Sequence, residues 1–222
     1  MFTVLLSILA IYASKKVDKA DPLQKPTGVV FWTVTVVDFF NTLVKDTLGE
    51  KYETSYGPYI GSLGIYLLVS NLSGLFSFNS PTRNFSVTLT LAVITWILVQ
   101  YTAIKETRVS GYLKSFIDPL PVLLIPNIFG KIAPLISLSM RLFGNILSGS
   151  IIMGLLYTFL AFVSNSLVGL VVGSGVESFN FLAVVIAPWL HGYFDVFAGC
   201  IQMYIFIVLT MVYIKNEIPE KN

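Results

Sequence analysis

The sequence contains two long runs without a single charged side chain. The first is Tyr56–Thr82 and the second is Asn84–Ile104, and only Arg83 separates them. Each run reaches the ~20 residues that an α-helix needs to cross the hydrocarbon core of a bilayer. Pro81, close to Arg83, favours a turn between the two runs. Residues 56–104 are therefore predicted to form a helical hairpin in a membrane.

The composition of the whole chain supports the same interpretation. Hydrophobic residues make up 55% of the sequence and charged residues 12%, whereas a soluble domain carries roughly 25% charged residues. So few charges cannot cover the surface of a water-soluble domain of 222 residues. We therefore expect an all-α integral membrane protein with a single domain over residues 1–222 and about five to six helices.

Several kinds of chemistry lack the residues that they need. The formal net charge of +2 gives no reason to expect a nucleic-acid partner. The single cysteine, Cys200, and the single histidine, His191, are too few for a cysteine cluster, a histidine-based metal site or a catalytic triad. The sequence also has no phosphate-binding GxxxxGK loop, HExxH pair or nucleophile elbow. We expect no cofactor and no metal, and a chain that is not itself an enzyme.

Residues 1–55 differ from the rest because charges interrupt their apolar runs. Met1–Ala13 would rise only about 20 Å as a helix, which is less than the roughly 30 Å of the hydrocarbon core. This segment is either a partial span or a helix that continues into Ser14 and Lys15. Thr27–Val44 is apolar but is interrupted by Asp38. It is predicted to be an amphipathic helix that lies in the membrane interface.

Two later segments are too long to be simple upright spans. Pro121–Val163 carries only two charged residues, Lys131 and Arg141, and as one straight helix it would extend about 65 Å. It is either a hairpin or a long, steeply tilted element that bends at its prolines. Phe179–Ile214 poses the same problem of length. Residues 121–214 are therefore expected to hold the long elements that carry ions.

Basic residues set the expected topology. They gather in Lys15–Lys25, in Lys105–Lys114 and in the tail from Lys215 to Lys221, whereas Ser164–Ser178 carries Glu177 and no base. The positive-inside rule places basic segments on the cytoplasmic or matrix side. The N-terminus is thus expected outside and the C-terminus inside, with the loop around Glu177 on the outer side.

Arg141 is the most informative residue, because an arginine within a long apolar element costs at least ~2.5 to 3.5 kcal/mol on insertion scales. On a helix, Ser137 and Ser148 would lie within about 40° of Arg141, and Asn145 about 40° further round. Ionisable residues inside a membrane mark functional sites. The alternative is that Arg141 pairs with an acid elsewhere in the chain and only fixes helix packing.

A second polar face lies on the last element. His191, Asp195 and Gln202 are spaced i, i+4 and i+11, within about 40° of one helix face. Imidazole and carboxyl groups can both accept and release protons. This face is therefore predicted to be capable of proton transfer. The alternative is a His–Asp hydrogen bond at the membrane interface with no transport role.

The run 137–149, SLSMRLFGNILSG, resembles the arginine-bearing helix of subunit a of F-type ATP synthases. Two further segments support the resemblance: 81–91, PTRNFSVTLTL, and 201–213, IQMYIFIVLTMVY. Their order and spacing agree with this family over residues 58–214. The resemblance implies two long tilted helices packed along a rotating ring of subunit c. It also implies subunit b of the peripheral stalk as a partner.

By this resemblance Arg141 is the stator arginine that faces the ring, and Asn145 and Gln202 are its polar neighbours. Asp195 takes the position of a channel-lining histidine or glutamate. The sequence departs from the common family pattern because Ser150, Asn84 and Asn127 stand where acids are frequent. Acidic groups along the pathway are therefore scarce, and Asp195 is expected to carry more of it. The candidate ion-pathway residues are Arg141, Asn145, Ser148, Ser150, His191, Asp195 and Gln202.

The resemblance implies a function in which a proton or a sodium ion passes through two offset half-channels and drives ATP synthesis by the whole complex. The implied location is the bacterial plasma membrane, with the mitochondrial inner membrane as the alternative. Two other functions stay open. One is a self-contained transporter or channel that binds a small anion at Arg141, which inverted repeats would favour. The other is a non-conducting assembly subunit in which Arg141 and Asp195 pair.

Overall fold

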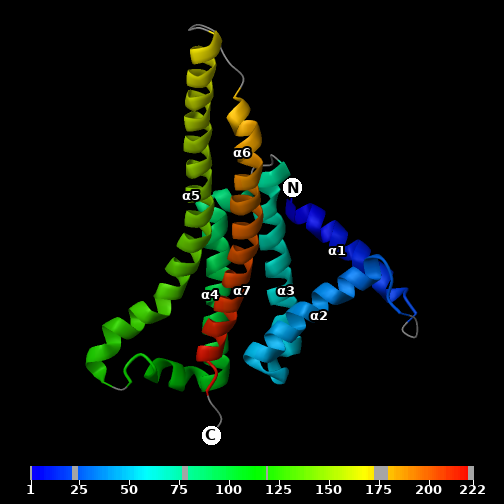
Figure 1. Ribbon diagram of the computed structural model, residues 1–222. Coiled ribbons are helices and arrows are strands. Elements are labelled where there is room, and N and C mark those ends of the chain that lie inside the picture. Colours follow the sequence, from blue (N-terminus) through cyan, green and yellow to red (C-terminus); the bar gives the residue numbers. More distant parts are fainter. Residues whose placement is uncertain (1, 22–24, 77–79, 119, 173–179, 220–222) are drawn as a thin grey trace.

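The computed structural model describes residues 2–21, 25–76, 80–118, 120–172 and 180–219, and all regular elements within these ranges are helical (Figure 1). The all-α prediction is confirmed. In chain order the elements are α1 (Phe2–Asp18), α2 (Val29–Leu48), α3 (Glu50–Leu72), η1 (Ser73–Phe76), η2 (Pro81–Arg83), α4 (Phe85–Lys114), η3 (Pro121–Leu123), α5 (Leu124–Val172), α6 (Phe181–His191), η4 (Gly192–Phe197) and α7 (Ala198–Asn216).

Three stretches of the described residues are long and apolar enough to cross a membrane. They are Phe85–Lys114, Pro121–Gly169 and Phe181–Asn216, which confirms the expectation of an integral membrane protein. The helix α3 is not one of them, although no charge follows Glu53 within it. Its tyrosines, its glycines and Asn71 lower its mean hydropathy, so the absence of charge alone overstated its apolar character.

The N-terminal helices lie against one side of the molecule. The helix α1 extends through Lys15 to Asp18, so the helix does continue beyond the apolar run. The helix α2 crosses the molecule obliquely and packs on α3 (Figure 1). Close packing is possible because Gly64 has no side chain: a Cβ there would lie 2.6 Å from Cε1 of Phe40.

The helices α3 and α4 run in opposite directions and are joined by two hydroxyl contacts. Tyr56 and Thr102 are 2.7 Å apart, and Tyr59 and Thr95 are 2.8 Å apart. Two boundaries differ from the sequence prediction. The helix α3 begins at Glu50 and ends at Leu72, and α4 continues past Ile104 to Lys114. The helix α4 is sharply kinked at Arg108.

The segment that was too long for an upright span is one helix and not a hairpin. The helix α5 has 49 residues and bends in its N-terminal part, where Pro134 lies inside the helix (Figure 1). A proline cannot donate the usual backbone hydrogen bond and clashes with the preceding turn, which explains a bend here. Since α5 continues to Val172, the expected loop does not begin at Ser164. Glu177 and Phe179 lie outside the described residues.

The last three elements form a second continuous helical stretch, Phe181–Asn216. The helix α7 lies at the centre of the lower part of the molecule in Figure 1 and packs against α2, α3, α4 and α5. Its side chains Phe206, Ile207, Met211 and Ile214 are fully buried and belong to the core. The upper parts of α5 and α6 project together beyond the other helices (Figure 1).

Candidate functional site

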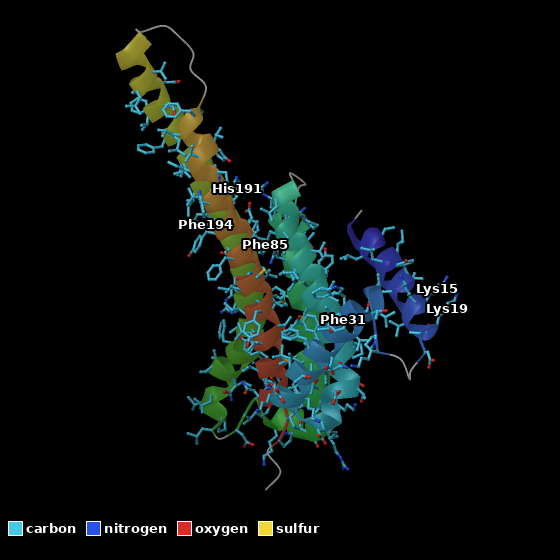
Figure 2. The ribbon with its side chains drawn as sticks, turned by 45° about the vertical axis from the view of Figure 1, so that its right-hand side comes forward. Lys15, Lys19, Phe31, Phe85, His191 and Phe194 are labelled. Carbon is cyan, nitrogen blue, oxygen red and sulfur yellow. The ribbon has the colours of Figure 1, made fainter. Side chains whose placement is uncertain are left out.

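A cavity of about 320 Å³ lies where the end of α3 and the η2 turn meet the middle of α5 and the junction of α6 with α7. Figure 2 shows His191 and Phe194 on the last of these elements. Of the polar side chains that line this cavity, Arg83 carries a permanent charge, and the others are neutral or can gain or lose a proton. The polar lining residues are Asn71, Ser80, Arg83, Asn145, Ser150, Tyr157, His191 and Asp195.

A hydrogen-bonded chain crosses the cavity wall from α5 to η4. Asp195 Oδ2 lies 2.6 Å from Nδ1 of His191, and the Tyr157 hydroxyl lies 2.9 Å from Nε2 of the same ring. When Asp195 is ionised, the Nδ1–H group of His191 donates a hydrogen bond to the carboxylate. In the neutral ring, Nε2 then accepts a hydrogen bond from the Tyr157 hydroxyl. The histidine therefore links two groups that can each exchange a proton.

A π-helical turn, Gly192–Phe197, carries Asp195. Such turns are rare and occur frequently at functional sites. A π-helix has more residues per turn than an α-helix, so His191 and Asp195 lie closer to the same direction than helical spacing alone gives. His191 and Asp195 line the cavity, and Gln202 is not among its lining residues. A polar face shared by all three residues stays a prediction.

Buried polar side chains connect the end of α3 to the start of α7. Asn71 Nδ2 donates to the carbonyl oxygen of Gly199 at 3.0 Å, and the Thr82 hydroxyl lies 3.4 Å from Asn71 Oδ1. Ser80 contacts Thr82 at 2.7 Å and donates to the carbonyl oxygen of Ser70 at 2.7 Å. The sequence interpretation missed this group. The available signal was uncharged polar residues in an otherwise apolar run.

Arg83 also lines the cavity, although from the sequence it marked only a turn. It lies at the end of η2, directly before α4. Within the described ranges it forms no ion pair. Arg83 therefore brings to this cavity a positive charge that has no ion-pair partner among the residues the structure describes.

Arg141 lies outside this cavity, on α5 and closer to the bend than Asn145. It is half-buried and donates to Ser137 Oγ at 3.3 Å. No ion pair of Arg141 occurs among the residues that the structure describes. The alternative in which Arg141 pairs with Asp195 is wrong, because Asp195 is held by His191.

The other predicted residues divide into two groups. Asn145 and Ser150 line the cavity, and the Ser150 hydroxyl donates to the carbonyl oxygen of Leu147 at 2.8 Å. Ser148 points outside it and donates to the carbonyl oxygen of Asn145 at 3.0 Å. Gln202 is 5% exposed, and its amide nitrogen has no hydrogen-bond partner within the described part of the chain.

Comparison with known proteins places these features in a family. The family model described as ATP synthase A chain matches residues 1–215. The chain belongs to this ATP synthase A chain family. Its members include ATP synthase subunit a of Mycoplasma pneumoniae, 34% identical over 227 residues that cover 96% of this chain and 74% of that protein. Subunit a of Oceanobacillus iheyensis is 30% identical over 226 residues, covering 98% of this chain and 86% of its own length.

The family assignment fixes the coarse function. As a member of the ATP synthase A chain family, the chain is part of the membrane sector of an F-type ATP synthase and serves ATP synthesis and ion transport. A further relative is the sodium ion specific subunit a of Propionigenium modestum. It is 30% identical over 202 residues, covering 84% of this chain and 62% of that protein. The resemblance found in the sequence is confirmed.

Proposed function

We propose that this subunit conducts ions through two offset half-channels beside a rotating ring of c subunits, and that residues 121–214 of its single domain carry the pathway. The outer half-channel includes the cavity lined by Asn145, Ser150, His191 and Asp195. The observation that carries the proposal is the separation of Arg141 from the cavity, although both involve α5. Arg141, without an acidic partner in the described chain, lies apart from a cavity that holds a titratable hydrogen-bonded chain.

The cavity chemistry favours the passage of protons. An imidazole can take up a proton at one ring nitrogen and release the other, so His191 can pass a proton between Tyr157 and Asp195. A sodium ion cannot pass through a ring nitrogen in this way and needs several oxygen ligands. Sodium remains the second candidate ion, and the Propionigenium modestum relative is named as sodium ion specific.

Arg141 supplies the barrier between the half-channels. A permanent cation at membrane depth without an internal partner is costly, and a carboxylate on the ring would compensate it. A cation near a carboxylate favours its ionised form, so each arriving ring carboxylate would release its ion near Arg141. The gradient supplies about 2.3 kcal/mol per charge per 100 mV. Asn145, Ser148 and Gln202 are proposed as polar neighbours of this step.

The partners and location follow from this function. The subunit contacts the c-ring along α5, whose apolar side chains are largely exposed, and subunit b of the peripheral stalk. Helix α2 lies in the membrane interface, and the complex resides in the bacterial plasma membrane. Bond formation in ATP takes place elsewhere in the complex, so this subunit is not itself an enzyme. The rival function, a self-contained anion transporter, has no specific observation in its favour.

Arg141 provides the decisive test. We expect Arg141→Ala to abolish coupled ATP synthesis in membrane vesicles that contain the assembled complex, and to leave them passively leaky to ions. Arg141→Lys keeps the charge but loses the planar, weakly hydrated guanidinium, and should be severely impaired. Near wild-type synthesis by assembled Arg141→Ala complex would overturn the assignment.

A further inference from the structure

Lys131 and Glu217 form an ion pair that the ion pathway does not use. The Lys131 ammonium lies 2.6 Å from both carboxylate oxygens of Glu217. Each side chain is only 19% exposed, whereas the lysines of typical surface pairs are well solvated. Lys131 lies in the bent N-terminal part of α5, and Glu217 follows directly after α7. The pair therefore joins two elements that are far apart in the sequence.

The end of α4 adds a third element to this cluster. The Lys131 ammonium lies 5.5 Å from the centre of the Tyr112 ring, within the range of a cation–π interaction. Trp96 Nε1 donates to the backbone oxygen of Lys131 at 2.6 Å. Lys131 is thus held by its side chain and by its backbone at once.

A strained residue lies beside the cluster. Arg108 interrupts α4 with φ 61° and ψ 164° and is the one non-glycine residue with positive φ in the described chain. Such a conformation is strained and persists only where the surroundings hold it. Tyr112, four residues later, donates to Gln100 Oε1 at 2.7 Å and so ties the two sides of the kink together.

The bent part of α5 has little apolar packing to hold it in place. None of the residues 124–137 is buried. Ile125, Phe129 and Ile136 are 66%, 69% and 56% exposed. Polar contacts therefore hold the bent part of α5 in place, as core packing does for the other helices.

We propose that Lys131, Glu217 and Tyr112 form a clasp that fixes the bent part of α5 against the ends of α4 and α7. Arg141 lies ten residues further along the same helix, which is about 15 Å of helical rise. The clasp thereby sets where Arg141 faces, and Lys131 and Glu217 are positioning residues. This consequence for Arg141 rests on the function proposed above, whereas the clasp itself does not.

The ion pair is suited to this task because both side chains are largely buried and the ammonium contacts both carboxylate oxygens. Removing one partner of such a pair leaves a charge without compensation and is strongly unfavourable. Reversing both charges keeps the attraction. A single substitution and the reversed pair should therefore have opposite outcomes.

The test uses the whole ATP synthase in lipid vesicles, with cysteines only at Phe129→Cys and Val212→Cys for spin labels. Lys131→Met and Glu217→Gln are compared with the reversed pair, Lys131→Glu with Glu217→Lys. Lys215→Met is the control, since it removes an exposed lysine from the same helix end. The distance between the labels and the rate of coupled ATP synthesis per assembled complex are measured.

We expect both single variants to broaden or shift the label distance and to lower coupled synthesis by about tenfold, because a misplacement of about 1 Å can cost a hundredfold. The reversed pair should restore both, and Lys215→Met should change neither. An unchanged distance in both single variants would overturn the clasp. A changed distance with wild-type synthesis would remove its role in placing Arg141. If Lys131→Met does not assemble, Glu217→Gln, which keeps a neutral acceptor for the lysine, decides the same question.

Discussion

The amide of Asn71 is packed directly onto the backbone of Gly199, near the cavity that contains Asp195. Asn71 Nδ2 donates to the carbonyl oxygen of Gly199 at 3.0 Å, and a Cβ at Gly199 would lie 3.2 Å from Cβ of Asn71. The contact joins the end of α3 to the start of α7, because Gly199 follows Ala198, the first residue of α7, and the π-helical turn ends at Phe197. The orientation of that turn depends on how closely these two helices approach.

Gly199→Ala should therefore disturb the turn that carries Asp195. Overpacking typically costs about 1–3 kcal/mol, which exceeds the about 1 kcal/mol that alanine gains over glycine in a helix. We expect lower thermal stability of the membrane sector and slower ATP synthesis. Gly130→Ala is the matched control, since its Cβ would meet open space. Equal thermal stability of the two variants would show that Asn71 can move aside.

Asp195→Ala should slow ion-driven ATP synthesis while the complex still assembles. The carboxylate is the group that accepts a hydrogen bond from His191, and alanine leaves that ring nitrogen without its partner. Asp195→Glu and Asp195→His should each recover part of the rate, because both side chains can titrate. Synthesis rates per assembled complex give the comparison, and an unchanged rate in Asp195→Ala would reduce the residue to packing.

Tyr157→Phe removes one hydroxyl and no other part of the hydrogen-bonded chain. If the chain passes protons, we expect the rate of ATP-driven proton uptake by vesicles to fall several-fold, which is less than the roughly 10²–10⁴-fold that a positioned acid or base contributes to proton transfer. Tyr193→Phe, on the adjoining turn and 55% exposed, is the control. Equal rates in the two variants would exclude the Tyr157 hydroxyl from the pathway.

Arg108→Gly should preserve or raise stability, because glycine adopts positive φ without the steric cost that arginine bears. Arg108→Ala removes the same side chain but keeps the strain, so it should be less stable than Arg108→Gly by about 1 kcal/mol. Thermal unfolding of the assembled membrane sector measures the difference. A more stable alanine variant would indicate that the kink relaxes on substitution.

Topology remains a prediction that reporter fusions can decide. Lys105–Lys114 and Lys215 lie at the same end of the molecule, where α4 and α7 end, and α5 ends at the opposite end (Figure 1). Lys15 on α1 and Lys19, directly after α1, lie on the side away from α5 and α6 (Figure 2). We expect the segment 15–25 to share a membrane side with Lys215. Labelling of position 177 from that same side would contradict the two half-channels.

The helix content could be predicted from the sequence, and so could the lack of an acidic partner of Arg141 among the described residues, because both are visible in local runs of residues. Absence of charge over more than 20 residues requires a helix in a membrane, and a charge in such a run is visible by itself. The choice between a hairpin and one bent helix for residues 121–163 was different. It depends on how the segment packs against the other helices, and no local pattern reports that packing, since Pro134 permits a turn as well as a bend.

The cavity could be predicted only in part for the same reason. The spacing of His191 and Asp195 already indicated that they meet. Tyr157 and Arg83 joined them only through tertiary packing, since they lie on α5 and η2. The predicted direction of Gln202 assumed 100° per residue, although the π-helical turn Gly192–Phe197 lies between His191 and Gln202.

The uninterrupted course of α5 has a consequence for the evolution of this subunit. Arg141, Ser150 and Tyr157 lie on a single helix, so their relative directions are fixed by residue count alone. Inserting or deleting one residue between Arg141 and Tyr157 would rotate one of them by about 100° relative to the other. Length changes should therefore be excluded from this stretch even where a substitution is tolerated. Length changes before α5 leave this register intact and are expected to be tolerated.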